Sequence, residues 1–391
     1  MNHSEQLPID RRSLNTVFIL ILATAAVQAA VGYNTVLFPV SLEAYGYSKF
    51  LIGLCLAFEM GAVITIINCI DWILGKFGLV GTFALATGLR LLVLLLLANT
   101  QNFPFWCVSV FCFGMCTYMC LISLQTWVNA ISVGRFRGLV SGCYSSALSL
   151  GTASGPILFN QLGSSGGSQA FQGNMVIVLV ALMVIIPLLT QQPRFLSQGR
   201  LRILYAIRMA KVPMLSSFVG GVTFFGLPAF LTLYGMINGL SIQRASLLLT
   251  AFMLGSVILG LLISSLSNRN NRTFVTILCV LIGVLCAVFL PLAIYNYFIA
   301  VCLLFVWGGA AGGIYATGLS AVAELFRKED QVSANVAYSI LDNVGGIIAV
   351  LSIGFLMGSG ISDGIVYVIV TTALCYFIYC LAQLINTEHM V

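Results

Sequence analysis

Charged side chains are scarce in this chain, and histidine is almost missing. Only 7% of the 391 residues are charged, whereas a soluble domain carries about 25%. So few charges cannot cover a globular surface in water, so most of the surface must face lipid. Both histidines, His3 and His389, lie near the chain ends. No nucleophile–base pair, zinc-ligand spacing or phosphate-binding glycine loop lies in an accessible segment, so we expect no enzyme, cofactor or metal site.

Long apolar runs take the place of the missing charge, because 60% of the residues are hydrophobic. A helix needs ~20 apolar residues to cross a bilayer. By this measure the sequence predicts an all-α membrane protein with twelve transmembrane helices. Their approximate ranges are 14–41, 48–70, 79–99, 104–130, 138–162, 173–191, 213–237, 245–266, 273–294, 297–322, 333–358 and 365–385.

The basic residues are distributed unevenly between the predicted loops. If the N-terminus is cytoplasmic, the cytoplasmic segments hold fourteen of the 17 Lys and Arg residues, and the other side holds Lys49 and Arg244. Loops rich in Lys and Arg remain in the cytoplasm. This distribution predicts a multi-pass protein of the cytoplasmic membrane with both termini cytoplasmic. It also explains the net charge of +6 without nucleic acid as a partner.

The 12 cysteines all lie within apolar runs, which favours packing over a disulfide framework. Three of them, Cys112, Cys116 and Cys120, form a stripe with helical spacing in the 104–130 segment. A soft metal such as Cu(I) would suit such thiolates. No histidine joins the stripe, so packing is the favoured interpretation.

An internal repeat divides the chain into two halves. We expect an N-terminal six-helix bundle over 1–191, a basic linker over 192–212 and a C-terminal six-helix bundle over 213–391. The linker is interpreted either as a partly amphipathic helix on the membrane surface or as a solvated segment. The landmarks, at an offset of about 194 residues, are Gly32 with Gly226, Gly114 with Gly308, Gly151 with Gly345, and the basic loop at Lys76 with Arg269 and Arg272.

The 138–162 segment is rich in small residues. Gly142, Gly151 and Gly155 allow a neighbouring helix to approach closely, as membrane helices do. Pro156 must bend the helix or re-route its hydrogen bonds. We interpret this segment as a sliding and bending surface between the two halves of a transporter.

The same segment carries a resemblance to the major facilitator superfamily of transporters, whose members also have twelve helices and a basic central linker. Many antiporters of that superfamily have a fifth helix with the pattern Gly, eight residues, Gly, three residues, Gly-Pro, two residues, Gly-Gly. Gly142, Gly151, Gly155 and Pro156 fit this pattern, but the run Phe159–Asn160 replaces the closing glycines. The resemblance therefore implies the fold more directly than it implies antiport.

Two further likenesses are partial. The superfamily's loop pattern Gly-x-x-x-Asp-Arg-x-Gly-Arg is matched at Lys76 and Gly78, with Asp71 one turn before the expected acid. The pair of opposite charges that this loop contributes to gating is therefore either rebuilt from Asp71 or absent.

In a sparsely characterised bacterial branch, the fourth helix ends acid–Ser/Thr–Trp–Leu–Asn, and an Arg-Gly loop follows. The run here has Gln125 in place of the acid, so no proton role is carried over to it. The expected gating and helix-packing residues are Asp71, Lys76, Gly78, Arg135, Arg137, Gly142, Gly151, Gly155 and Pro156.

Three ionisable side chains lie well inside predicted helices, namely Glu59, Arg90 and Asp342. A charge in that position costs ~2.5–3.5 kcal/mol on insertion scales, so it needs a partner, a water-filled cavity or a function. Glu59 and Arg90 lie at similar depths on neighbouring helices, so they can form an ion pair. This pair is expected to act either in proton coupling and substrate binding or as a structural brace.

Asp342 has no obvious basic partner within a helix. Its helix is the repeat partner of the 138–162 segment, so it should line the interface between the halves. A carboxyl group removed from water is protonated more readily, so Asp342 is the preferred proton-coupling residue, followed by Glu59. The alternative is an acid that is hydrogen-bonded to the neighbouring Ser339 and Asn343.

Polar residues inside the apolar helices are candidates for a substrate cavity. For each of them, ordinary hydrogen bonding between helices is the alternative. Pro228, with glycines at 220, 221 and 226, also marks the 213–237 segment as bendable. The cavity candidates are Gln28, Asn34, Thr35, Tyr118, Gln125, Tyr315, Thr317, Tyr338 and Asn343.

Together these features predict a monomeric secondary transporter that works by alternating access with a small-molecule substrate, protons and membrane lipids as partners. Proton-coupled efflux of an amphipathic compound is the first hypothesis, because the expected cavity is apolar and aromatic with few charges. Proton-coupled uptake of a nutrient or a metal chelate is the second. A non-transporting membrane receptor and a lipid scramblase are hypotheses of a different class.

Overall fold

The computed structural model describes residues 11–131, 137–163, 167–188, 203–267, 272–327 and 330–388. Every element in these ranges is a helix, which confirms the predicted all-α fold. Eleven segments of the described chain are long and apolar enough to cross a membrane. The helix α4 completes the set of twelve, and its 26 residues give a length of ~39 Å, which exceeds the ~30 Å hydrocarbon core.

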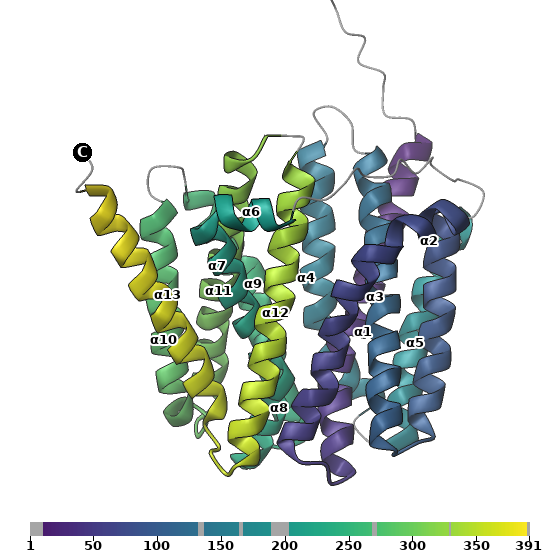
Figure 1. The fold of residues 1–391 in the computed structure, drawn as a ribbon. Helices are drawn as coiled ribbons and strands as arrows, with labels where there is room; N and C mark the ends of the chain where they lie inside the picture. Colours follow the sequence, from purple (N-terminus) through teal and green to yellow (C-terminus); the bar gives the residue numbers. More distant parts are fainter. Residues whose placement is uncertain are drawn as a thin grey trace, which may run out of the picture.

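The N-terminal half contains five helical elements and a short 3₁₀ turn. They are α1 (Arg11–Ala44), α2 (Lys49–Ala98), α3 (Phe103–Ile131), α4 (Arg137–Leu162), α5 (Gly167–Ile185) and η2 (Ile186–Leu188). The 50-residue α2 contains two predicted transmembrane helices, joined without a separate loop. The chain turns at Gly78, whose φ of 68° and ψ of 177° are open in practice to glycine alone. In Figure 1, α2 rises, bends over at the top and returns.

The C-terminal half contains α6 (Ile203–Met209), α7 (Lys211–Gly221), η3 (Val222–Gly226), α8 (Leu227–Ile237), α9 (Ile242–Leu266), α10 (Arg272–Ala293), α11 (Tyr297–Leu325), α12 (Gln331–Gly358) and α13 (Gly364–Glu388). The predicted 213–237 helix is thus α7, a π-helical turn and α8. The turn lies between Gly221 and Pro228. Single π-helical turns are frequent at functional sites, and proline supplies no backbone N–H for the next hydrogen bond.

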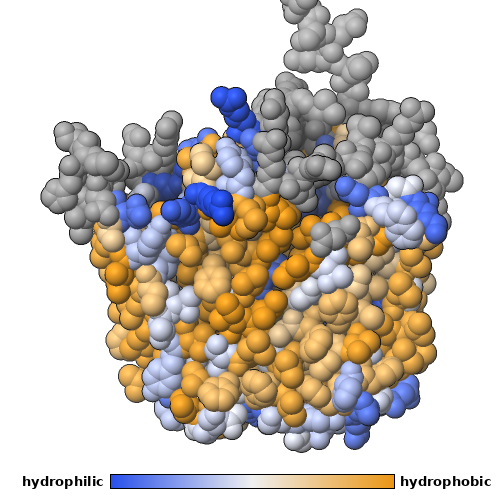
Figure 2. All heavy atoms as spheres, viewed as in Figure 1, coloured by the Kyte–Doolittle hydropathy of each residue, from blue (hydrophilic) through white to orange (hydrophobic). Residues whose placement is uncertain are grey.

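The two ends of the bundle differ in charge. The basic end, at the top of Figure 1, is where α1 begins and where α6 lies, and it includes Lys76 and Arg272. The opposite end includes Lys49 and Arg244. Figure 2 shows a broad hydrophobic band between these two more hydrophilic ends, as expected for a protein surrounded by lipid.

The short helix α6 lies across the basic end of the C-terminal half (Figure 1). Its Ala206 is buried in a cluster with Val322 of α11 and Ala337 of α12. Leu204 and Met209 are 71% and 62% exposed. A helix that buries one face and exposes large apolar side chains on another suits the surface of a membrane.

The hydrophobic core is arranged differently at the two ends. Toward the opposite end one cluster includes residues of both halves, such as Ile52 and Phe113 with Phe230 and Val350. Toward the basic end, one cluster contains only N-terminal residues and two others contain only C-terminal residues. The halves therefore pack together at the opposite end and have separate cores at the basic end.

The internal repeat is visible in how glycines bring helices together. A side chain at Gly151 of α4 would collide with α1, and a side chain at Gly345 of α12 would collide with α7. Gly114 of α3 lies against α2 at the Glu59 carbonyl, and Gly308 of α11 lies against α9 in the same way. Equivalent glycines therefore join equivalent helix pairs in the two halves.

Candidate functional site

A polar cluster bridges the two halves near the middle of the bundle. The hydroxyl of Tyr118 on α3 donates a hydrogen bond of 3.0 Å to Oδ1 of Asn343 on α12. Glu59 of α2 and Asp342 of α12 both lie within electrostatic range of that hydroxyl. A carboxyl group from each half therefore lies within electrostatic range of the same tyrosine.

Asp342 is held against the π-helical region of the C-terminal half. The backbone of Gly221 packs on the backbone of Asp342, and a Cβ at Gly220 would lie 3.8 Å from Asp342 Oδ1. This oxygen is buried and has no hydrogen-bond partner. The alternative expectation, a carboxyl satisfied by Ser339 and Asn343, is therefore not met at Oδ1. A buried carboxyl oxygen in this state is stabilised by taking up a proton or by contacting a polar ligand.

Aromatic side chains lie near this carboxyl group. The rings of Tyr315 and Tyr338 meet edge to face with centroids 5.3 Å apart, and Phe224 meets Tyr315 at 6.2 Å. The Tyr338 hydroxyl donates a 2.9 Å hydrogen bond to the Tyr315 carbonyl. The carbonyl of Tyr338 accepts a hydrogen bond of 2.5 Å from Ser217. These bonds fix Tyr338 within the C-terminal half, whereas Tyr315 remains half-buried.

Glu59 and Arg90 lie near each other, but the expected ion pair is not formed. Arg90 is fully buried, and none of its three guanidinium nitrogens has a hydrogen-bond partner. Its charge lies over the ring of Phe113, 4.7 Å from the centroid, and is within electrostatic range of Glu59, Cys116 and Cys120. The close packing of α3 on α2 at Gly114 engages the backbone of Glu59.

Other cavity candidates are engaged inside one half. Asn34 is hydrogen-bonded to Asn174 of α5, and Thr35 donates to the Val31 carbonyl of its own helix. Thr317 accepts a 3.0 Å hydrogen bond from Thr276 of α10. For these three, the structure shows the hydrogen bonding within one half that was the alternative expectation. Asn174 and Thr276, which the sequence reasoning did not select, are recognisable only as polar residues within apolar helices.

Two further candidates lie outside the cluster. Gln28 is half-buried beside Gly151, at the contact between α1 and α4. Gln125 is exposed near the end of α3.

The α4 segment packs in two directions. Side chains at Gly151 and Gly155 would overlap the backbone of α1 in the same half, whereas Gly142 has open space around it. Pro156 is accommodated within a continuous helix. The contact with the other half comes from larger residues at the end of α4, which the glycine pattern did not predict.

That contact closes the opposite end of the bundle. Asn160 of α4 donates 3.0 Å to the Gln243 carbonyl and accepts 2.9 Å from the Ser246 hydroxyl, both on α9. Thr250 of α9 donates 3.1 Å to the Ala153 carbonyl. On the other flank of the bundle, a Cβ at Gly53 of α2 would collide with α12.

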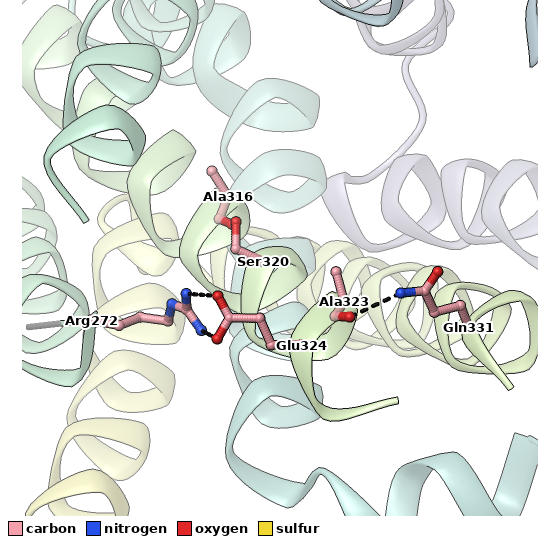
Figure 3. Close-up of polar contacts among 6 residues, drawn as sticks. All are labelled: Arg272, Ala316, Ser320, Ala323, Glu324 and Gln331. Carbon is pink, nitrogen blue, oxygen red and sulfur yellow. Dashed lines mark hydrogen bonds and ion pairs between the residues drawn. The ribbon is translucent and has the colours of Figure 1, made fainter. Parts of the chain in front are cut away.

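At the basic end, the charged side chains make contacts within their own half. In Figure 3, Arg272 at the start of α10 makes a bidentate ion pair with Glu324 of α11, at 2.7 Å and 3.0 Å. Gln331 of α12 donates 2.9 Å to the Ala323 carbonyl (Figure 3). In the N-terminal half, Lys76 lies 5.0 Å from the Trp72 ring centroid.

Three further candidates at the basic end are Asp71, Arg135 and Arg137. Asp71 is exposed. Arg135, and the side chain of Arg137, lie outside the described residues. In the cysteine stripe, Cys112 is exposed and Cys116 and Cys120 are buried. No group of three or more potential ligands in the described chain is arranged to hold a metal.

Comparisons with known proteins agree with this architecture. The sequence profile of the Major Facilitator Superfamily matches residues 20–350 and again 213–388. The chain is 26% identical over 278 residues to the uncharacterised MFS-type transporter YfkF of Bacillus subtilis (strain 168), which covers 70% of this chain and 71% of that protein.

Two solved structures share the fold. The nucleoside transporter NupG superposes with a TM-score of 0.74 at 12% identity, over 95% of this chain and 98% of its own. A bacterial homologue of the human lysosomal transporter Spinster, inward-facing and occupied, gives 0.73 at 13% identity over 97% of both chains. With the profile match over most of its length, the chain belongs to the Major Facilitator Superfamily of membrane transporters.

Proposed function

We propose that this protein exports a small amphipathic organic solute from the cytoplasm by proton-coupled alternating access. One observation carries the proposal. A carboxyl group from each half, Glu59 and Asp342, lies within electrostatic range of Tyr118, whose hydroxyl bonds across the halves to Asn343. A site shared by two rigid bundles changes its exposure when the bundles tilt against each other.

The orientation rests on the distribution of basic residues, which favours a cytoplasmic basic end. The cross-half contacts of Asn160 and Thr250 then close the far side of the membrane. The separate cores at the basic end suit a cleft that opens toward the cytoplasm. This arrangement corresponds to the state in which an exporter takes up its substrate.

Asp342 is the proposed proton-coupling residue, because its Oδ1 is buried without a partner. Glu59 is the second candidate. One elementary charge that crosses 100 mV supplies ~2.3 kcal/mol, which supports a gradient of roughly 50-fold. A single carboxyl group is therefore sufficient for accumulation. The aromatic rings of Phe224, Tyr315 and Tyr338 beside it supply an apolar surface for the solute.

The test is solute flux in proteoliposomes with an imposed proton gradient. A thermal-shift screen of the purified protein against a panel of fluorescent amphipathic dyes first selects the tracer. Asp342→Asn is expected to abolish gradient-driven flux and to retain exchange of tracer between the two sides. Asp330→Asn is the matched control, because Asp330 precedes α12 and its side chain makes no capping bond. It lies ~18 Å along the helix axis from Asp342.

The other outcomes point to other functions. If flux through the wild-type protein did not depend on the imposed proton gradient, this result would contradict proton coupling. Movement of labelled lipid without a gradient would indicate a scramblase, and binding without any flux would indicate a receptor. Flux driven toward the cytoplasm would favour uptake of a nutrient or a metal chelate over export.

A further inference from the structure

A groove of about 630 Å³ runs along the outside of the C-terminal half between α9 and α11. Leu247 and Leu254 line it from α9, and Val301 and Phe305 line it from α11. These side chains are apolar, and Val306 on the rim is 42% exposed. The groove therefore opens toward the surrounding membrane.

Glycine contacts close one end of this groove. Gly255 of α9 packs against the backbone of Phe305, and Gly308 of α11 packs against the backbone of Phe252. Such contacts bring the two helices together so closely that no side chain fits between them. An apolar chain that entered the groove from the opposite end of the bundle would stop there.

The other end of the groove carries a positive charge. The guanidinium carbon of Arg244 lies 5.7 Å from the ring centroid of Tyr297, which lines the groove. Tyrosine is enriched where the hydrocarbon core meets the headgroups. Arg244 and Lys49 are the basic residues expected at this end of the protein. The groove thus begins with an exposed cation at headgroup level.

The length of the groove matches one leaflet. From Tyr297 to Val306 the helix rises nine steps of ~1.5 Å, or ~14 Å. This is about half of the ~30 Å hydrocarbon core. One lipid acyl chain fills that depth.

We propose that this groove binds one acyl chain of an anionic phospholipid, whose phosphate contacts Arg244. Thr250 lines the groove and also donates a hydrogen bond to the Ala153 carbonyl of the other half. The bound chain therefore touches a side chain that closes the opposite end. A ligand that contacts one arrangement of the halves more fully than another shifts the population toward it, so the lipid stabilises the closed opposite end.

The test is lipid retention from vesicles of equimolar phosphatidylglycerol and phosphatidylcholine, measured by native mass spectrometry of the full chain. One arginine near the surface favours an anionic lipid by about fivefold. We expect this preference in the wild-type protein and its loss in Arg244→Gln. Lys49→Gln, which removes the other basic residue of that end, is the matched control and is expected to keep the preference.

A second pair of variants tests the groove itself. Leu254→Trp fills it from α9 and is expected to lower the retention of both lipids. Val301→Phe fills it from α11 and replaces the first variant if that one folds poorly.

Equal retention of both lipids by the wild type, or unchanged retention in the filled variants, would overturn the proposal. Appearance of a dimer that the filled variants abolish would assign the groove to a second copy of the chain instead. The proposal does not depend on the transported solute.

Discussion

Tyr118 and Asn343 join the two halves through a 3.0 Å hydrogen bond between side chains near the middles of their helices. The Asn343 amide is oriented by a second bond, from Nδ2 to the Ser339 carbonyl at 2.8 Å. Its neighbour Asp342 lies in the same turn of α12 and has a buried, unpartnered Oδ1. A movement of α3 against α12 therefore changes the surroundings of this carboxyl group directly.

Tyr118→Phe is predicted to weaken the closure of the opposite end. The substitution removes one cross-half hydrogen bond, with a net contribution of about 0.5–1.5 kcal/mol. We expect an increased population of molecules open at that end and slower flux. The measurement is the distance distribution between spin labels at Gln101 and Ile361, which lie in loops of different halves at the opposite end.

Tyr338→Phe is the matched control for this experiment. The Tyr338 hydroxyl bonds within its own half, to Tyr315. Its loss should lower the thermal stability and leave the spin-label distances unchanged. Identical distance distributions for Tyr118→Phe and the wild type would show that the bond does not contribute to the closure.

Asn160→Gly restores the glycine of the antiporter pattern and is predicted to open the same end more strongly. Asn160 makes two cross-half hydrogen bonds, to the Gln243 carbonyl and from the Ser246 hydroxyl. Their loss corresponds to roughly 1–3 kcal/mol. The expected result is a broader and longer distance distribution between the labels. Ser256→Ala, which removes a bond inside α9, should leave that distribution unchanged.

Much of the fold could be predicted from apolar length and charge. The predicted break between 273–294 and 297–322 is found between Ala293 and Tyr297, because the turn residues interrupt two apolar runs. The turn at Gly78 follows from a glycine in a basic segment. For the π-helical turn after Gly221, Pro228 and the nearby glycines predicted a bendable segment but not the kind of turn. Its surroundings include the backbone contact between Gly221 and Asp342, residues far apart in the sequence.

The site was predicted in part, for a related reason. A polar residue within an apolar helix marks a special position, and this signal selected Tyr118, Tyr315 and Asp342, which lie within electrostatic range of one another. It does not give the rotation of the helix about its axis. Asn34 and Thr317 were therefore selected with the rest, but they face Asn174 and Thr276 inside single halves. The cross-half role of Asn160 is visible in the sequence only as a departure from a motif.

Two glycines of α4 are predicted to respond in opposite ways to the same substitution. A methyl group at Gly155 would overlap the backbone of α1 at Gly32 and Tyr33. Backbone cannot move aside cheaply, so Gly155→Ala should lower the stability by about 1–3 kcal/mol. Gly142→Ala meets nothing within 4 Å and should raise helix stability by about 0.5–1 kcal/mol. Thermal unfolding of both purified variants is the measurement, and equal shifts would contradict the close α1–α4 contact.

The last prediction concerns Glu59 and Arg90, which are near each other but not hydrogen-bonded. A buried guanidinium without a partner is costly. Its position over Phe113 offsets about 2 kcal/mol of that cost, and the Glu59 charge supplies further stabilisation. Either Glu59→Gln or Arg90→Met alone leaves one charge in the interior, so both should destabilise. The double variant should recover part of the loss, with a coupling energy of about 1–3 kcal/mol.

Flux through the same double variant distinguishes a structural brace from a charge pair that takes part in transport. A brace needs only a neutral, well-packed interior, so Glu59→Gln with Arg90→Met would then transport like the wild type. A pair that forms and breaks during transport is different, because its attraction must favour one arrangement of the halves over another. In that case the double variant would unfold normally on heating but lose gradient-driven flux. Purely additive effects on stability would show that the two charges do not interact at all, and both roles would then be excluded.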